Sequence, residues 1–202
     1  VIFSGKALQT TVPPDGSVST AKIASSAVDL TSKVTGVLPV ANGGTGLSSS
    51  EADQFRLTAD TTNGANGDIT ADLERVDDAT FAKIGTGMTE SSGVFTFPST
   101  GLWQVIANPL FVAVSDNSAD VYILASSTSG SSYDNVARAS GGGGGSSFDR
   151  SSSYSSTFVN VTNASTFRVK FLRDSFGSSS RLVGNTVETA TNFMFIRLGG
   201  SQ

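Results

Sequence analysis

The chain contains no cysteine and no histidine among its 202 residues. Without cysteine it forms no disulfide and offers no thiolate nucleophile or thiolate ligand for zinc. Without histidine it lacks the imidazole that serves as a general base or metal ligand near neutral pH. Extracellular domains of this size often use disulfides, so we expect oligomerisation to supply the missing stability. The alternative explanation is assembly in a reducing cytoplasm, where disulfides are not needed.

Active-site motifs are also missing. Serine is abundant, but it has no histidine partner and no G-x-S-x-G turn surrounds it. The glycine-rich Gly85-Thr86-Gly87 is not followed by the Lys-Ser/Thr pair of a phosphate-binding loop. Two carboxylates suffice for glycoside hydrolysis, and residues 72–78 carry several. We therefore expect no enzyme and keep a glycan depolymerase as the catalytic alternative.

Positive charge and long apolar runs are scarce. The chain has 13 Lys and Arg against 17 Asp and Glu, a net charge of -4 and a pI near 4.7. A nucleic-acid-binding protein would carry a basic stripe, so we expect no nucleic-acid partner. No apolar run reaches the roughly 18 residues that a membrane-spanning helix needs. We therefore expect no membrane insertion.

Oxygen-bearing side chains gather in Asp116-Asn117-Ser118-Ala119-Asp120. Ca²⁺ takes about six to eight oxygen ligands, so Asp116, Asn117 and Asp120 would supply at most half of a site. The alternative is an ordinary turn rich in Asp and Asn. Calcium is the one cofactor that the sequence leaves open.

Residues 1–50 differ in texture from residues 51–202, and we expect an extended shaft and linker followed by a head domain. In the shaft, Val18, Ile23 and Val28 recur every five residues, a period that fits neither a strand nor an amphipathic helix. Such sparse apolar residues would be buried only around a symmetry axis shared by several chains. A short helix over residues 19–28 and a disordered linker are the alternatives.

Short β-prone runs separated by turn residues follow from residue 51 onward, with turn signals at Asn63-Gly64 and Asn66-Gly67. The expected strands are 55–58, 69–76, 81–84, 94–97, 102–114, 121–125, 136–139, 157–161, 167–172 and 192–198. Pro109 interrupts the longest run and predicts a bulge or an edge there. With few helix signals, the pattern predicts an all-β antiparallel sandwich or barrel.

Alternation along the last two runs assigns their faces. In the run 167–171, Phe167, Val169 and Phe171 should point inward, whereas Arg168 and Lys170 should point outward. The closing run is apolar on both faces, which carry Phe193 and Phe195 on one side and Met194, Ile196 and Leu198 on the other. A strand covered on both faces needs a second cover. We therefore predict that these residues lie at a subunit interface.

The segment 36–46 reads GVLPVANGGTG. It resembles a linker of the fibres and spikes of tailed bacteriophages, which stands before their C-terminal head. This resemblance implies a virion protein that holds and binds.

The run 91–105 reads SSGVFTFPSTGLWQV. It resembles the globular head of the first complement component, which is a tumour-necrosis-factor-like jelly roll. The segment 54–57 resembles the first strand of the phage-borne relatives, and the segment 191–199 resembles the closing strand. The resemblance implies a jelly-roll head over residues 51–202 and a tight homotrimer whose outer loops bind ligands. The segment 126–156 departs from the family pattern.

The segment 126–156 is rich in Gly and Ser and also carries aromatic and charged residues. Such a mixture suits binding loops, including loops that bind sugars. The candidate receptor-binding residues are Tyr133, Asn135, Arg138, Phe148, Asp149, Arg150 and Tyr154, with Arg181 from a second loop candidate. The alternative is a flexible loop without a binding role.

These observations together predict a trimeric tail fibre, a phage virion structural protein assembled in the host cytoplasm. The shaft would join other virion proteins, and the head would bind a glycan or protein on the host surface. A decoration fibre of the capsid or tail with a purely structural role is the first alternative. A depolymerase is the second.

Overall fold

The computed structural model describes residues 50–79, 81–143 and 149–202, without the side chains of Asp116 and Asn117. These residues belong to a compact unit that spans Gly46–Gln202. The predicted shaft and linker therefore lie outside the described residues, except for Ser50.

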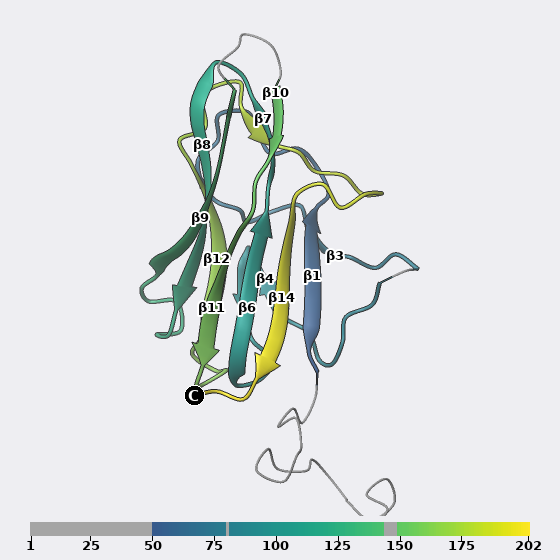
Figure 1. Cartoon of the computed structure of the whole chain (residues 1–202), viewed down its shortest axis with the longest axis vertical. Coiled ribbons are helices and arrows are strands. Elements are labelled where there is room, and N and C mark those ends of the chain that lie inside the picture. Colours follow the sequence, from purple (N-terminus) through teal and green to yellow (C-terminus); the bar gives the residue numbers. More distant parts are fainter. Residues whose placement is uncertain (1–49, 80, 144–148) are drawn as a thin grey trace, which may run out of the picture. The chain divides into compact units, whose positions relative to one another are not determined.

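The described residues form three antiparallel sheets (Figure 1). Sheet A consists, in spatial order, of β11 (Ser155–Val161), β6 (Gly101–Asn108), β14 (Asn192–Gly199), β1 (Ala52–Leu57) and β3 (Leu73–Arg75). Sheet B consists of β4 (Thr89–Ser91), β5 (Val94–Thr96), β12 (Arg168–Asp174), β8 (Asp116–Ser126) and β9 (Asp134–Gly143), and β2 (Gly67–Asp68) also pairs with β12. Sheet C consists of β10 (Asp149–Ser152), β7 (Leu110–Ala113) and β13 (Arg181–Leu182). The predicted all-β antiparallel sandwich of jelly-roll type is confirmed.

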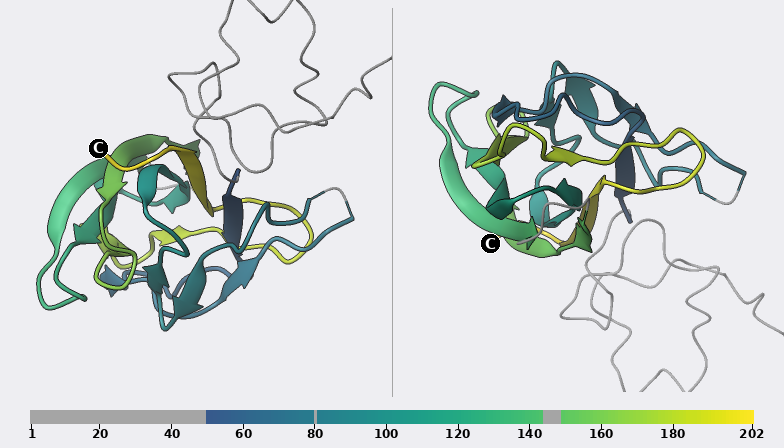
Figure 2. Two further views of the ribbon diagram at one scale, coloured as in Figure 1. Left: turned by 90° about the horizontal axis from the view of Figure 1, so that it is seen from below. Right: turned by 90° about the horizontal axis from the view of Figure 1, so that it is seen from above.

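Sheets A and B face each other, and phenylalanine fills the space between them. The rings of Phe171 from sheet B and Phe193 from sheet A stack with centroids 3.9 Å apart. Phe95 from sheet B lies 5.0 Å from Phe55 and 4.9 Å from Phe195, both from sheet A. Such aromatic pairs contribute beyond their buried area. These contacts across the sandwich hold the two layers together. Figure 2 shows the two layers end-on.

Pro109 divides the longest predicted run into β6 and β7. Both strands have a neighbour on each side, so Pro109 marks a break between two interior strands and does not lie at an edge. Ser153 donates its backbone N–H to the carbonyl of Pro109 at 3.2 Å. A proline is tolerated here because the ladder passes from one sheet to the next at this point.

Two of the predicted strands are wrong in extent or absent. The run 69–76 forms a strand at Leu73–Arg75 only, since Asp72 has a φ of 59° and turns the chain just before it. The run 81–84 forms no strand, and Ile84 makes an isolated bridge to Ala52. Local β propensity fails in both places because the chain turns to close the flank of the sandwich.

The Gly-rich segment 126–156, expected to form loops, contains all of β9 and β10. Gly141 pairs with Ala119 of β8. A Cβ placed on Gly141 would come within 2.4 Å of the Phe111 ring, a contact that real side chains do not make. Glycine is therefore required here so that the β9 backbone can pass over a core ring. The glycine content that suggested a loop is therefore explained, at Gly141, by close packing against the core.

Both ends of the described domain lie at the same end of the sandwich (Figure 1). In Figure 1, β1 begins near the C-terminal residue Gln202, and β7 and β10 lie at the opposite end, which we call the distal end. No helix in the described part of the chain is long and apolar enough to cross a membrane.

We expect Phe171→Ala to lower the free energy of unfolding by about 3–5 kcal/mol, because Phe171 is 1% exposed and contacts rings from both sheets. Urea denaturation of the full chain measures this loss. The control Val187→Ala, at a side chain that is 85% exposed, should change it by less than about 0.5 kcal/mol. A loss below about 1 kcal/mol for Phe171→Ala would contradict the central role of this ring.

Candidate functional site

The closing strand β14 presents one face to the core and one to the outside. Phe193 and Phe195 are fully buried within the sandwich of a single chain, and Met194 and Ile196 are half-buried on the outer face of sheet A. Leu198 is 44% exposed at the bulge that ends the strand. Of the five residues predicted at a subunit interface, Met194, Ile196 and Leu198 are therefore accessible to another subunit.

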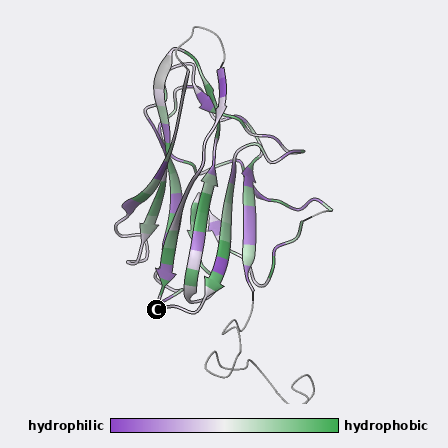
Figure 3. Cartoon of the chain, viewed as in Figure 1, coloured by the Kyte–Doolittle hydropathy of each residue, from purple (hydrophilic) through white to green (hydrophobic). Residues whose placement is uncertain are grey.

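A mostly apolar row, interrupted by Gln104, crosses the outer face of sheet A. Strand register places Phe158, Gln104, Ile196 and Ala52 side by side, and the isolated bridge adds Ile84. Phe158 is 64% exposed and Ile84 is 51% exposed. Figure 3 shows hydrophobic residues along most of β6 and β14 of this sheet. Large aromatic and aliphatic side chains on one exposed sheet face indicate an interaction surface; we call this row the sheet A belt.

Polar side chains bound the sheet A belt on its distal side. The amide of Asn192 accepts hydrogen bonds from Asn108 at 3.1 Å and from Gln54 at 3.5 Å. In the same row, Arg56 is 4% exposed and forms a salt bridge to Glu74 at 3.1 Å. Arg56 also lies 3.7 Å from Asp77. These carboxylates, candidates for glycoside hydrolysis, are thus engaged by Arg56.

The outer face of sheet B carries a polar and aromatic cluster. The guanidinium of Arg138 lies 5.8 Å from the ring centroid of Tyr122 and donates to its hydroxyl at 3.4 Å. Asp120 lies 3.7 Å from the same guanidinium and accepts a hydrogen bond from Ser140. The hydrogen bond to Tyr122 and the charge of Asp120 raise the pKa of Arg138 above its ordinary value. The cluster therefore presents a fixed cation beside an aromatic face.

A second aromatic contact lies on the same sheet. Lys170 approaches the ring of Tyr133, with Nζ 4.3 Å from the centroid, and forms a salt bridge to Asp68 at 2.8 Å. Strand register places Lys170, Leu124 and Asn135 in one row beside the row of Tyr122 and Arg138. We call Tyr122, Tyr133, Asn135, Arg138 and Lys170 the sheet B cluster.

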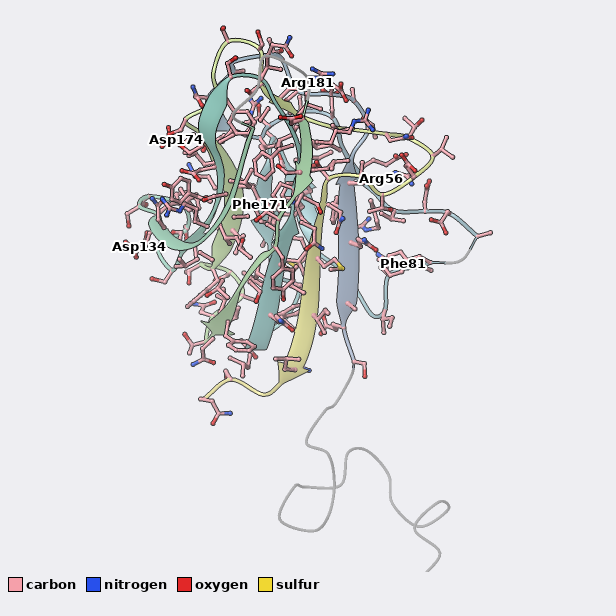
Figure 4. The ribbon with its side chains drawn as sticks, turned by 45° about the horizontal axis from the view of Figure 1, so that its top comes forward. Arg56, Phe81, Asp134, Phe171, Asp174 and Arg181 are labelled. Carbon is pink, nitrogen blue, oxygen red and sulfur yellow. The ribbon has the colours of Figure 1, made fainter. Side chains whose placement is uncertain are left out.

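A further charged cluster lies on sheet C. Arg150 of β10 and Arg181 of β13 both pair with Val112 of β7, so the two arginines flank one buried valine. Arg181 donates to Asp60 at 2.7 Å, and Gly184 donates its N–H to the same carboxylate at 3.1 Å. Figure 4 shows Arg181 at the distal end. We call Asp60, Arg150 and Arg181 the distal cluster.

The predicted receptor-binding residues thus fall into two groups. Tyr133, Asn135 and Arg138 lie in or next to β9 and belong to the sheet B cluster. Asp149 and Arg150 open β10, with Arg181 in the same sheet C. Tyr154 is 58% exposed just before β11. Phe148 lies outside the described residues.

The sequence analysis missed Tyr122, Asp120, Lys170 and Asp68. Strand pairing between segments distant in sequence brings Tyr122 and Lys170 into the sheet B cluster, and it brings Asp120 and Asp68 within reach of the cations of that cluster. The alternation that placed Lys170 on an outward face was the one available signal.

The predicted calcium ligands do not form a site among the described side chains. Asp120 is 6% exposed and engages Ser140 and Arg138, and the side chains of Asp116 and Asn117 are not described. Across the described residues, no group of three or more His, Cys, Asp or Glu side chains is arranged to hold a metal ion.

A hollow of about 470 Å³ opens at the flank of the sandwich between β3 and β4. The most prominent side chain there, Arg75, is held by the protein itself. It forms a salt bridge to the buried Asp53 at 3.0 Å, donates to the carbonyl of Met88 at 2.6 Å and lies over the ring of Phe55. Lys83 donates to the carbonyl of Thr86 at 2.7 Å. These interactions close the edge of the core.

Solved structures match this fold at low sequence identity. Eiger TNF from S. frugiperda is 10% identical with a TM-score of 0.57, over 76% of this chain and 96% of that chain. Murine APRIL at pH 5.0 is 11% identical with a TM-score of 0.54, over 74% of this chain and 99% of that chain. No protein-family model and no curated protein matches the sequence. At this identity the likeness concerns the fold alone, which is a tumour-necrosis-factor-like jelly roll.

The distal cluster predicts a specific loss of stability in acid. Partial desolvation acts to raise the pKa of Asp60, but the hydrogen bonds from Arg181 and Gly184 and the charges of Arg181 and Arg150 outweigh it and lower the pKa. A carboxyl whose pKa is lower in the folded chain stabilises the fold above its unfolded pKa of about 3.9. That contribution is lost as the pH falls through the folded pKa.

We therefore expect Asp60→Asn to reduce the melting temperature above about pH 4 and to flatten its fall at lower pH. Circular dichroism melts of both proteins across this range measure the effect. The exposed Asp134→Asn on β9 is the control and should leave the wild-type pH profile unchanged. Parallel profiles for wild type and Asp60→Asn would contradict the role of the distal cluster.

Proposed function

We propose that this chain is a homotrimeric bacteriophage fibre that attaches the virion to the surface of its host cell. The linker-like segment 36–46 supports a fibre, because the sequence resembles the region that precedes the head of phage fibres and spikes. The observation that carries the trimer is the sheet A belt, an exposed apolar row on a face whose opposite side already forms the core of the chain.

Covering the sheet A belt is energetically favourable. Removing a large apolar side chain such as Phe158 from water contributes about 1.5–3 kcal/mol, and three identical interfaces multiply that gain. A second copy of the same chain is the simplest cover, because the jelly-roll family that the sequence resembles is typically homotrimeric. Trimerisation would also supply stability that a chain without cysteine cannot gain from disulfides.

Attachment is supported by the surfaces that a trimer of this kind leaves outward. The sheet B cluster combines tyrosine rings with Arg138, Lys170 and Asn135, a combination suited to stacking on sugar rings and bonding their hydroxyls. Three heads on one fibre bind with avidity even where each contact is weak. A purely decorative fibre would need the sheet A belt but not the sheet B cluster.

We expect Ile196→Asp to dissociate the trimer, because a carboxylate at the centre of the sheet A belt would be buried without a partner in the assembly. Light scattering should give three times the 20.6 kDa of one chain for the wild type and a single chain mass for the variant.

The matched control for this assembly test is Val136→Asp. Val136 is 40% exposed on β9 of the other sheet, so its variant should remain trimeric. The proposed assembly would be contradicted if the wild type is a monomer. It would also be contradicted if Ile196→Asp remains a trimer and retains its circular dichroism spectrum.

We expect Tyr133→Ala to weaken binding of the fluorescent trimer to bacterial cells by about tenfold or more, as for aromatic anchors of binding sites. The wild-type fibre is first tested against a strain panel to find cells that retain it, and the variant is then titrated on those cells. Arg150→Ala tests in the same way whether the distal cluster binds the cells. Lys83→Ala, in the hollow between β3 and β4, is the control.

Each outcome of the cell-binding test separates the functions. Loss in Tyr133→Ala with an unchanged trimer mass supports attachment through the sheet B cluster. Loss in Arg150→Ala alone moves the site to the distal cluster. If the wild-type trimer binds to no bacterial strain of the panel, the result contradicts attachment and favours the decorative role.

A further inference from the structure

Arg173 lies on the core-facing side of sheet B. It pairs directly with Val121 of β8, which pairs with Ala139 of β9. Val121 is 0% exposed and Ala139 is 1% exposed in the core. Side chains of directly opposed residues in an antiparallel ladder share one face. The sequence therefore directs a cation inward at the point where β12 approaches the distal end.

The guanidinium of Arg173 has no protein partner among the described residues. Its Nε is buried with no hydrogen bond, and no ion pair joins its terminal nitrogens to a carboxylate within the described part of the chain. Desolvation by burial lowers the pKa of Arg173. Leaving a buried donor unsatisfied is costly, and more so for a charged group.

Arg173 lines a cleft of about 120 Å³ whose wall carries three threonines, Thr61, Thr62 and Thr70. The hydroxyl oxygen of Thr61 accepts a hydrogen bond from the N–H of Leu182, so its own O–H remains a donor. Two carboxylates also line the cleft. Asp68 is compensated by Lys170 at 2.8 Å, and Asp72 is exposed. The cleft therefore offers hydroxyl donors around one uncompensated cation.

We propose that this cleft binds a tetrahedral oxyanion, a phosphate or sulfate group, with Arg173 as its principal donor. At about 120 Å³ the cleft admits a group of about five heavy atoms. The planar fork of a guanidinium matches two oxygens of such an anion, and threonine hydroxyls can reach the others. Water would satisfy the donors but leave the charge uncompensated. The inference does not rest on the proposed attachment function.

The test is a titration of the full chain with inorganic phosphate and with sulfate at constant ionic strength, against chloride. Calorimetry should show saturable binding, and the melting temperature should rise with the same midpoint. Arg173→Met keeps the bulk of the side chain and removes its charge. We expect the affinity of this variant to fall at least about tenfold, since charge-assisted hydrogen bonds are lost.

The melting temperature of Arg173→Met in chloride, without phosphate or sulfate, provides a second test. Arg173 is half-buried, and replacing its partly desolvated, uncompensated charge by an apolar side chain should leave the melting temperature unchanged or raise it. Arg168→Met is the matched control, because it removes the same charge from the outer face of the same strand. It should retain the response to phosphate.

Titration with glucose 6-phosphate identifies the source of the anion. Binding at least as tight as that of inorganic phosphate indicates that a larger molecule carries the group into the open cleft. Much weaker binding indicates a free ion. Absence of saturable binding by both inorganic anions, or equal affinity in Arg173→Met and wild type, would overturn the proposal, and neither result bears on cell adsorption.

Discussion

The contact between phenylalanines of opposite sheets is the constraint on which the rest of the structure depends. Phe171 and Phe193 stack at 3.9 Å across the sandwich, and Phe95 joins Phe55 and Phe195. Because the chain has no disulfide, this aromatic layer must fix how sheets A and B lie against each other. Once the inner faces of the two sheets pack together, the alternation of side chains along each strand determines which residues lie on the outer faces. The sheet A belt and the sheet B cluster are both consequences of that layer.

The closing strand shows how one segment can serve both the core and a surface. Phe193 and Phe195 fill the core of the single chain, so the apolar residues between them cannot also be buried there. Ile196 therefore lies in the sheet A belt and Met194 in the row beside it, where a second chain is the simplest cover. A polar row at Asn192 and Asn108 limits that belt on its distal side. The same alternation leaves Lys170 of β12 and Arg138 of β9 on the outer face of sheet B.

Sequence reasoning predicted what depends on local pattern. The antiparallel sandwich, the break at Pro109 and the inward face of β12 follow from alternation or from a single residue's backbone restriction, whereas the jelly-roll type was implied by the resemblance of the run 91–105. It did not predict that Gly141 lies in a strand, since the reason is a ring of Phe111 far away in sequence. The partnership of Tyr122 with Arg138 was missed for the same reason, because register between strands is a tertiary property.

Two inward-facing arginines of this fold differ in one respect that bears on function. Arg75 pairs with Phe55 on the core side of sheet A, and the protein supplies the 2% exposed Asp53 to neutralise it at 3.0 Å. Arg173 occupies the equivalent kind of position in sheet B without such a carboxylate among the described residues. A cation needed only to close an edge would be compensated as Arg75 is. The difference favours a counter-charge for Arg173 that comes from outside the chain.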